Sequence, residues 1–174
     1  RYGFAPDLMT CAKGISSGYV PLGAVVVAGH VREPFWRDDA APFVHGGTYA
    51  GHPAACVAGL VNLDILERER LVERVATLDP VLSRLLAPLR DLPGVAGVRS
   101  VGLAGAVELD AALLAHHPAA GAAVVLAARK HGVLTRLLRG VALQVSPPFV
   151  VTEDELALIV DGLAASLQET VPAR

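Results

Sequence analysis

One lysine of the sequence stands where a reactive amine could be placed. Lys13 lies in LMTCAKGISSGYVPLGAVVV (residues 8–27), directly after an apolar run and before a glycine-rich segment. Moving an ammonium group away from water costs free energy unless the group is paired or neutral. A lysine held in a largely dry site can therefore be a neutral amine, able to act as a nucleophile or base toward a carbonyl compound. The residues alone leave a second interpretation open, a solvated lysine in a loop.

The segments around Lys13 predict the elements that would position it. Residues 8–11 read as a short strand, and residues 23–28 are β-branched and bounded by glycines, which is typical of a fully buried strand. HGGTYAGHP, which starts at residue 45, is a glycine-rich loop and opens a helix over residues 53–69. Because that helix is apolar almost all round, we expect it to be deeply buried.

A second helix begins at Leu71, where leucine and valine recur at spacings of three and four residues. Pro80 and Pro88 interrupt this stripe, which predicts a kink or a break near Asp79. A domain boundary is expected between residues 70 and 95.

From residue 94 the pattern changes to short strands and helices. We expect two strands within residues 94–109, a helix over 120–132, and strands at VLTR and VALQVS (133–136 and 141–146). The last helix should start at Thr152, where Glu155 three positions later completes a capping box. Strands and helices alternate to the end, so the fold class is α/β or α+β with two layers.

Composition narrows the class of protein further. The chain has 174 residues, 53% of them apolar, and a formal net charge of -2. We expect a globular protein that binds neither nucleic acid nor a membrane surface, because basic runs and apolar stretches of about 20 residues are both absent. Cys11 and Cys56 lie in apolar sequence, which predicts small buried side chains in a reduced, cytoplasmic protein. His116 and His117 have no further ligand at metal spacing, so no metal site is expected.

Five blocks of sequence resemble, in order and at compatible spacings, the C-terminal half of the class III aminotransferases, the pyridoxal 5'-phosphate enzymes of fold type I. They are PDLMTCAKGISSGYVPLGAVVV, FVHGGTYAGHPAACVAGLVNLDILERERL, GVRSVGLAGAVEL, GVLTR and SPPFVVTEDEL. The resemblance covers nearly the whole chain. It implies that residues 1–70 are the C-terminal part of the large, cofactor-binding domain. Residues 71–174 are then a linking helix and an α+β small domain.

The same resemblance implies a transaminase that transfers an amino group from an amino acid or ω-amino compound to a keto acid. Lys13 matches the lysine that forms a Schiff base with the aldehyde of the cofactor and then shuttles a proton. Thr48, beside Gly47, matches the threonine that reaches across a homodimer interface to the cofactor phosphate of the other subunit. For Thr48, a cap of the following helix or turn is the alternative.

Arg136 in GVLTR matches the arginine that pairs with the substrate carboxylate, for which a guanidinium offers a planar, bidentate fit. The spacing from Arg136 to the SPP segment is one residue longer than the usual family pattern. Arg139 is therefore an alternative, and a solvated surface arginine is another.

Other functions stay open beside the transaminase. A mutase or decarboxylase of the same fold, a non-catalytic half-chain that keeps only the dimer surface, and a cofactor-free Schiff-base aldolase are the alternatives. The family's pyridine-binding aspartate, phosphate-binding Gly/Ser loop and stacking aromatic ring normally precede the block that begins this sequence. The chain lacks an initiator methionine, so we expect it to start in mid-protein and to be catalytically incomplete alone.

Overall fold

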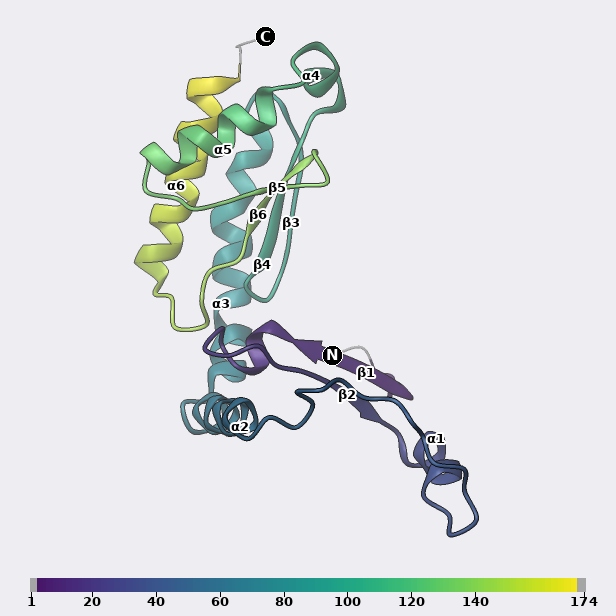
Figure 1. The fold of residues 1–174 in the computed structure, drawn as a ribbon. Coiled ribbons are helices and arrows are strands. Elements are labelled where there is room, and N and C mark those ends of the chain that lie inside the picture. The colour runs from purple at the N-terminus through teal and green to yellow at the C-terminus, as the bar shows by residue number, and fades with distance from the viewer. Residues whose placement is uncertain (1–2, 172–174) are drawn as a thin grey trace. The chain divides into compact units, whose positions relative to one another are not determined.

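The computed structural model describes residues 3–171, which form two compact units. The first unit ends at Glu69 and the second begins at Arg70. Each unit is described by itself below (Figure 1).

The first unit is built around a two-stranded ribbon. Strand β1 (Leu8–Ala12) pairs antiparallel with β2 (Gly23–Val27). The chain then forms two short helical segments, α1 (Gly29–Arg32) and the 3-10 turn η2 (Glu33–Phe35), before the long helix α2 (Pro53–Arg68). The predicted strands and helix of this region are confirmed in position.

The predicted burial of this region is wrong. Every residue of β2 is exposed, and α2 buries only Ala55 and Gly59. Both cysteines also differ from expectation, because Cys11 is half-buried and Cys56 is exposed. An apolar sequence indicates that covering its side chains would be favourable. The side chains are buried only where another element of the structure lies on them.

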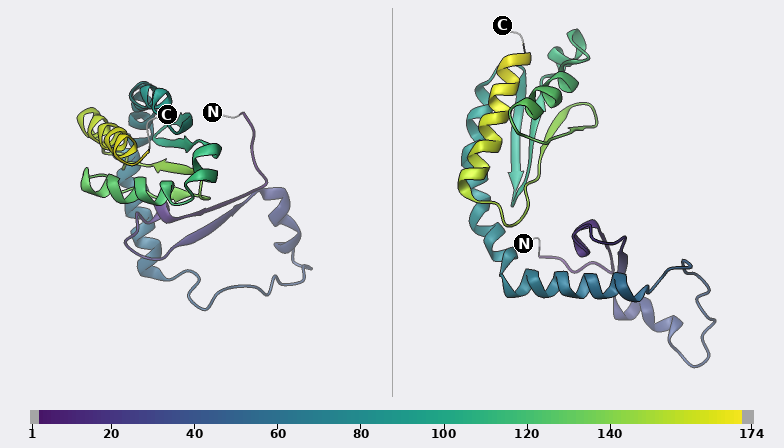
Figure 2. Two further views of the ribbon diagram at one scale, coloured as in Figure 1. Left: turned by 90° about the horizontal axis from the view of Figure 1, so that it is seen from above. Right: turned by 60° about the vertical axis from the view of Figure 1, so that its left-hand side comes forward.

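The second unit has a four-stranded antiparallel sheet with the order β3-β4-β6-β5. Its strands are β3 (Val95–Val101), β4 (Ala104–Leu109), β5 (Leu137–Leu138) and β6 (Ala142–Val145). Its helices are α3 (Leu71–Leu86), η3 (Ala87–Asp91), α4 (Ala111–His116), α5 (Ala120–Lys130) and α6 (Glu153–Thr170). Figures 1 and 2 show α3, α5 and α6 gathered on one side of this sheet. This is the two-layer arrangement that the sequence predicts.

The core of the second unit is continuous from α3 to the end of α6. Leu82 and Leu86 of α3, Leu143 of β6 and Leu156 and Leu163 of α6 are fully buried in it. The start of α6 follows the predicted capping box. The Thr152 hydroxyl accepts a hydrogen bond from the Glu155 N–H at 3.2 Å, and a Glu155 carboxylate oxygen accepts one from the Thr152 N–H at 2.8 Å.

Two predictions for this unit differ from the structure. Of the kink or break expected near Asp79, the break does not occur, because α3 runs unbroken through Pro80. Proline removes one backbone hydrogen bond, but Leu78, Val81 and Leu82 around it are buried in the core and hold the segment helical. The helical path tightens only at η3, where Pro88 stands in the first turn.

The segment at residues 133–136 is not a strand. Regular pairing with β6 begins only at Leu137, so β5 has two residues. Thr135 and Arg136 are instead bound to Gln144 of the neighbouring strand β6. The Thr135 hydroxyl donates to the Gln144 carbonyl at 2.7 Å, and the Gln144 N–H donates to the Arg136 carbonyl at 3.0 Å. A side-chain hydrogen bond thus replaces a rung of the ladder.

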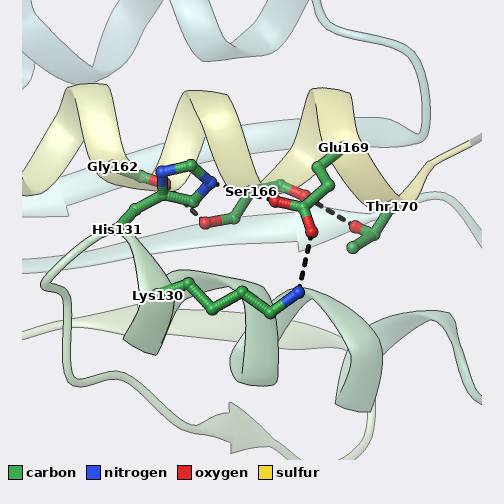
Figure 3. A network of polar contacts seen from close by, with 6 residues as sticks. All are labelled: Lys130, His131, Gly162, Ser166, Glu169 and Thr170. Carbon is green, nitrogen blue, oxygen red and sulfur yellow. Dashed lines mark hydrogen bonds and ion pairs between the residues drawn. The ribbon is translucent and has the colours of Figure 1, made fainter.

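A polar cluster joins the end of α5 to the last turns of α6 (Figure 3). Lys130 and His131 each contact a different carboxylate oxygen of Glu169, at 3.0 and 3.1 Å. The hydrogen bond from Lys130, followed by the contact with His131, holds the pKa of Glu169 below its ordinary value. The carboxylate lies in the last turn of a helix, where the helix dipole disfavours negative charge, and the two basic side chains offset that cost.

Candidate functional site

Lys13 immediately follows β1 and opens the 3-10 turn η1 (Lys13–Ile15). Its backbone has φ 54°, in the left-handed region that a side chain with a Cβ rarely adopts. This conformation costs about 1 kcal/mol or more and persists only where the surrounding structure fixes it. The Lys13 side chain is exposed, which agrees with the solvated loop lysine and not with the dry site among the two interpretations of the sequence. The turn lies at the surface of the first unit.

An open pocket of 650 Å³ lies at the Lys13 turn. Its wall is formed by Ala12, Lys13, Ser16, Gly18, Val20, Pro21, Leu22 and Gly23. Ser16 is buried, and its hydroxyl donates to the Val20 carbonyl at 2.6 Å, which closes the loop between η1 and β2 on itself. The lysine amine is thus the charged group on a wall that otherwise carries small, apolar and hydroxyl side chains.

The HGGTYAGHP loop meets the Lys13 loop at a neighbouring pocket of 290 Å³. Tyr49, His52 and Ala55 line it together with Val20 and Pro21. Two segments that are about 30 residues apart in the sequence therefore lie side by side in the first unit.

Thr48 and Gly47 lie in the turn at the start of this loop. The Ala50 N–H donates to the Gly47 carbonyl at 2.9 Å, and Gly51 has φ 70°. The N-cap of α2 is His52, so the alternative in which Thr48 caps this helix is wrong. The Thr48 side chain is exposed. From the same loop, Tyr49 and His52 line the 290 Å³ pocket, and Thr48 does not.

Arg136 belongs to the second unit, where it stands between Thr135 and β5. Its Nε donates to the Gln144 side-chain oxygen at 2.6 Å. Both residues line an open pocket of 340 Å³ with Leu134, Thr135 and Ser146. Since Gln144 engages Nε, the terminal nitrogens Nη1 and Nη2 are the pair with which Arg136 could hold a carboxylate.

Arg139, the alternative to Arg136, lies in the turn between β5 and β6. Its backbone has φ 49°, and the turn closes with a hydrogen bond from the Val141 N–H to the Leu138 carbonyl at 3.0 Å. Arg139 is exposed and stands outside the wall of the Gln144 pocket.

Sequence reasoning missed two polar residues of these sites. Asn62 of α2 donates from its side-chain nitrogen to the carbonyls of Gly14 and Ile15, at 2.9 and 3.2 Å. Gln144 of β6 holds Arg136. In each case the available signal was the one amide side chain in a mostly apolar run, AACVAGLVNLDIL and VALQVS.

Two further properties concern residues 3–171 only. Within that range, the structure brings together no group of three or more His, Cys, Asp or Glu side chains that could hold a metal ion. The helices of the same range are all too short or too polar to cross a bilayer.

Known proteins resemble this chain in sequence and in fold. The class-III aminotransferase family model matches residues 1–167. The chain is 40% identical over 172 residues to an adenosylmethionine-8-amino-7-oxononanoate aminotransferase of Nitratidesulfovibrio vulgaris. The aligned region covers 95% of this chain and 32% of that protein. The chain is also 34% identical over 177 residues to a putrescine–pyruvate aminotransferase of Pseudomonas aeruginosa. That aligned region covers 99% of this chain and 38% of that protein.

A solved structure shares the fold. The thermostable (S)-enantioselective ω-transaminase from Thermomicrobium roseum superposes with a TM-score of 0.89 at 37% identity, over 98% of this chain and 39% of that one. The predicted aminotransferase fold is confirmed. The chain spans about a third to two fifths of the length of these relatives. With a family match that extends over nearly all of its length, the chain belongs to the class-III aminotransferases.

Proposed function

We propose that this chain carries the lysine-bearing part of a pyridoxal 5'-phosphate-dependent transaminase. The reaction moves an amino group from an amino acid or ω-amino compound to a keto acid. The observation that carries the proposal is Lys13 itself, an exposed primary amine at the end of β1, on the wall of a 650 Å³ pocket. The relatives named as aminotransferases support the same reaction class.

The residues at Lys13 fit an aldehyde cofactor. An accessible amine attacks an aldehyde in its neutral form, and a paired carboxylate favours the charged form instead. The other pocket residues are small, apolar or hydroxylated, so none of them offers a carboxylate to Lys13. The chain's second lysine, Lys130, is by contrast bound to Glu169 at 3.0 Å.

Lys13 would hold the cofactor aldehyde and supply the base of the reaction. When bound, pyridoxal 5'-phosphate supplies an electron sink that stabilises negative charge at the substrate carbon that bears the amine. The Lys13 Nζ, once released by the amino substrate, would take the proton from that carbon and return it during transfer. The left-handed backbone of Lys13 fixes the point on the pocket wall from which the side chain extends.

Thr48 and Gly47 would hold the phosphate of the cofactor in the other subunit of a homodimer. Support comes from the Gly47–Gly51 turn, which leaves the Thr48 hydroxyl exposed. Leu8, Val26, Leu60 and Leu63 of the same unit are also exposed. Covering exposed apolar side chains in a protein–protein contact is favourable.

Arg136 would bind the carboxylate of the amino donor or the keto acid. The Gln144 oxygen engages Nε and leaves the two terminal nitrogens for a bidentate contact. The exposed turn of Arg139 offers no comparable partner for its orientation, which favours Arg136. The first unit would then be the C-terminal part of the large domain and the second the small domain, in a cytoplasmic enzyme where Cys11 and Cys56 stay free.

Reductive trapping tests the assignment of Lys13. The chain is incubated with pyridoxal 5'-phosphate and reduced with borohydride, and the modified peptides are quantified by mass spectrometry. Because Lys13 and Lys130 are the two lysines of the chain, each molecule contains its own control. We expect the adduct at Lys13 ahead of Lys130, with a visible absorption band before reduction.

Two variants complete this test. Lys13→Ala should abolish both the band and the main adduct, whereas Lys130→Ala should keep them. Equal modification of the two lysines, at the rate of a free amine, would contradict the proposal and favour the non-catalytic chain that keeps only a dimer surface.

A further inference from the structure

The left-handed turn at Lys13 needs a partner that holds it in place. Lys13 has φ 54° and Ser17 has φ 50°, so two residues with a Cβ adopt an unfavourable backbone within one short loop. Within η1 the backbone bonds are long, from the Ser16 N–H to the Lys13 carbonyl and from the Ser17 N–H to the Gly14 carbonyl, both at 3.3 Å. Such bonds alone are weak restraints on a strained turn.

Helix α2 supplies the missing restraint. The Asn62 side-chain nitrogen donates both of its protons to this turn, to the Gly14 carbonyl at 2.9 Å and the Ile15 carbonyl at 3.2 Å. These are the two residues that follow Lys13. A primary amide has two donors on one nitrogen, so a single side chain fixes two successive carbonyls.

The approach of α2 to the turn is close. At Gly59, three residues before Asn62, an added Cβ would lie 2.7 Å from the Leu22 Cδ2 atom and 3.7 Å from the Ile15 carbonyl oxygen. The far side of the loop is fixed by the buried Ser16 hydroxyl. The loop that carries Lys13 is thus held by Ser16 from within and by α2 from outside.

We propose that Asn62 is a positioning residue for Lys13: it fixes the Lys13–Ile15 turn and thereby the direction in which the amine leaves the pocket wall. The inference deepens the proposed function and rests on it for the chemistry of Lys13. Asn62 acts through the backbone of Gly14 and Ile15 and needs no contact with the cofactor or substrate.

Two variants of Asn62 distinguish the effect of its hydrogen-bond donors from the effect of its side-chain size. Asn62→Asp keeps the size of the side chain, removes both donors and places a carboxylate against two carbonyl oxygens. Asn62→Ala removes the donors without adding charge. Asp64→Asn is the matched control, because Asp64 lies two residues further along α2 and pairs with Arg68 at 2.8 Å.

The main readout is the ratio of trapping at Lys13 to trapping at Lys130 in the same folded molecules. Losing hydrogen bonds of ordinary strength lowers the population of the competent turn, so we expect the ratio to fall about tenfold in Asn62→Ala, and further in Asn62→Asp. Asp64→Asn should leave the ratio unchanged. Circular dichroism of the visible band should weaken in parallel, because that signal requires a fixed orientation of the bound group.

Hydrogen exchange at residues 13–17 provides a readout that is independent of the cofactor. Faster exchange in Asn62→Ala than in Asp64→Asn supports the proposal, even in a protein that shows no selective trapping.

If the original chain shows no preference for Lys13, the proposed function fails. If the original chain prefers Lys13, and Asn62→Ala keeps both that preference and the slow exchange at residues 13–17, the positioning role is overturned. A purely structural role would lower the melting temperature but leave the trapping ratio of the folded molecules unchanged.

Discussion

The two units of the chain use apolar side chains in opposite ways. In the second unit, the leucines and valines of α3, α6 and the sheet meet in one continuous core. In the first unit, the buried side chains that the structure describes are Ser16 and Ala55, while Val26 of β2 and Leu60 of α2 remain exposed. The sequences of both regions are rich in apolar residues, so composition alone does not distinguish them.

The difference lies in the pattern of the apolar residues. The second unit concentrates them on one face of each helix, which local neighbours can cover. The first unit has an apolar helix without a polar face and a strand apolar on both sides, and its short ribbon cannot cover either. The second unit therefore has the features of an independently stable scaffold, whereas the first carries Lys13, the candidate site residue.

A matched pair of leucine truncations gives the largest expected contrast. Leu82 is 0% exposed and Leu60 is 67% exposed. Leu82→Ala should lower the free energy of unfolding of the second unit by about 2–5 kcal/mol, because it opens a cavity in the core. Leu60→Ala should change stability by less than about 0.5 kcal/mol. Denaturant titration followed by far-UV circular dichroism measures both, and equal losses would contradict the comparison.

A matched pair of glycine substitutions tests how rigid the packing is in each unit. A Cβ at Gly162 of α6 would lie 2.5 Å from Val133 Cγ2 and 3.1 Å from the His131 carbonyl oxygen, neither of which can move easily. We expect Gly162→Ala to cost about 1–2 kcal/mol, the penalty of overpacking less the gain in helix propensity.

The partner substitution lies in the first unit. At Gly59 the nearest atom is the end of the flexible Leu22 side chain, at 2.7 Å. Gly59→Ala should therefore change the melting temperature less than Gly162→Ala does, and the reverse order would show that the α2 contact is the more rigid one.

These contrasts also explain how far the sequence could predict the fold. The capping box at Thr152 was predictable because the two residues that form it are three positions apart and need no distant partner. For α3 the sequence predicts a kink or a break near Asp79, and the break does not occur, because the local effect of Pro80 is outweighed by burial of its neighbours in a core that includes α5 and α6. Local signals succeed where the interaction is local.

The candidate site follows the same rule. Lys13, Thr48 and Arg136 were found from the motifs that surround them, and these assignments remain predictions. Asn62 and Gln144 were not found, because the partner of each lies outside its own helix or strand and is not marked in the local sequence. The sequence left both a dry and a solvated Lys13 open, because it does not determine which other elements cover a loop.

The cap of α6 predicts how the scaffold responds to acid. Hydrogen bonds from the Thr152 N–H and hydroxyl hold the pKa of Glu155 below its ordinary value. A carboxyl whose pKa is lowered by folding stabilises the native state above its unfolded pKa, about 4.3 for glutamate, and that contribution is lost as the pH falls through the lower folded value.

The test is a series of denaturation curves between about pH 6 and pH 3. Stability of the second unit should fall with acid, and Glu155→Gln should flatten that dependence over the lower part of the range. Thr152→Ala should lower stability by about 1 kcal/mol at neutral pH through loss of the cap. An unchanged acid profile in Glu155→Gln would exclude this carboxyl as its source.

The smallest expected effect compares the two lysines directly. Lys130 is bound to Glu169 at 3.0 Å, whereas Lys13 faces an open pocket without a carboxylate in its wall. Glu169→Gln removes the charge that holds Lys130, so trapping at Lys130 should rise. The rise should be about twofold, because an exposed ion pair contributes little. Trapping at Lys13 should not change, since Glu169 belongs to the other unit. A rise at both lysines would mean that the variant loosens the whole chain, and the preference for Lys13 would then reflect general accessibility rather than a site.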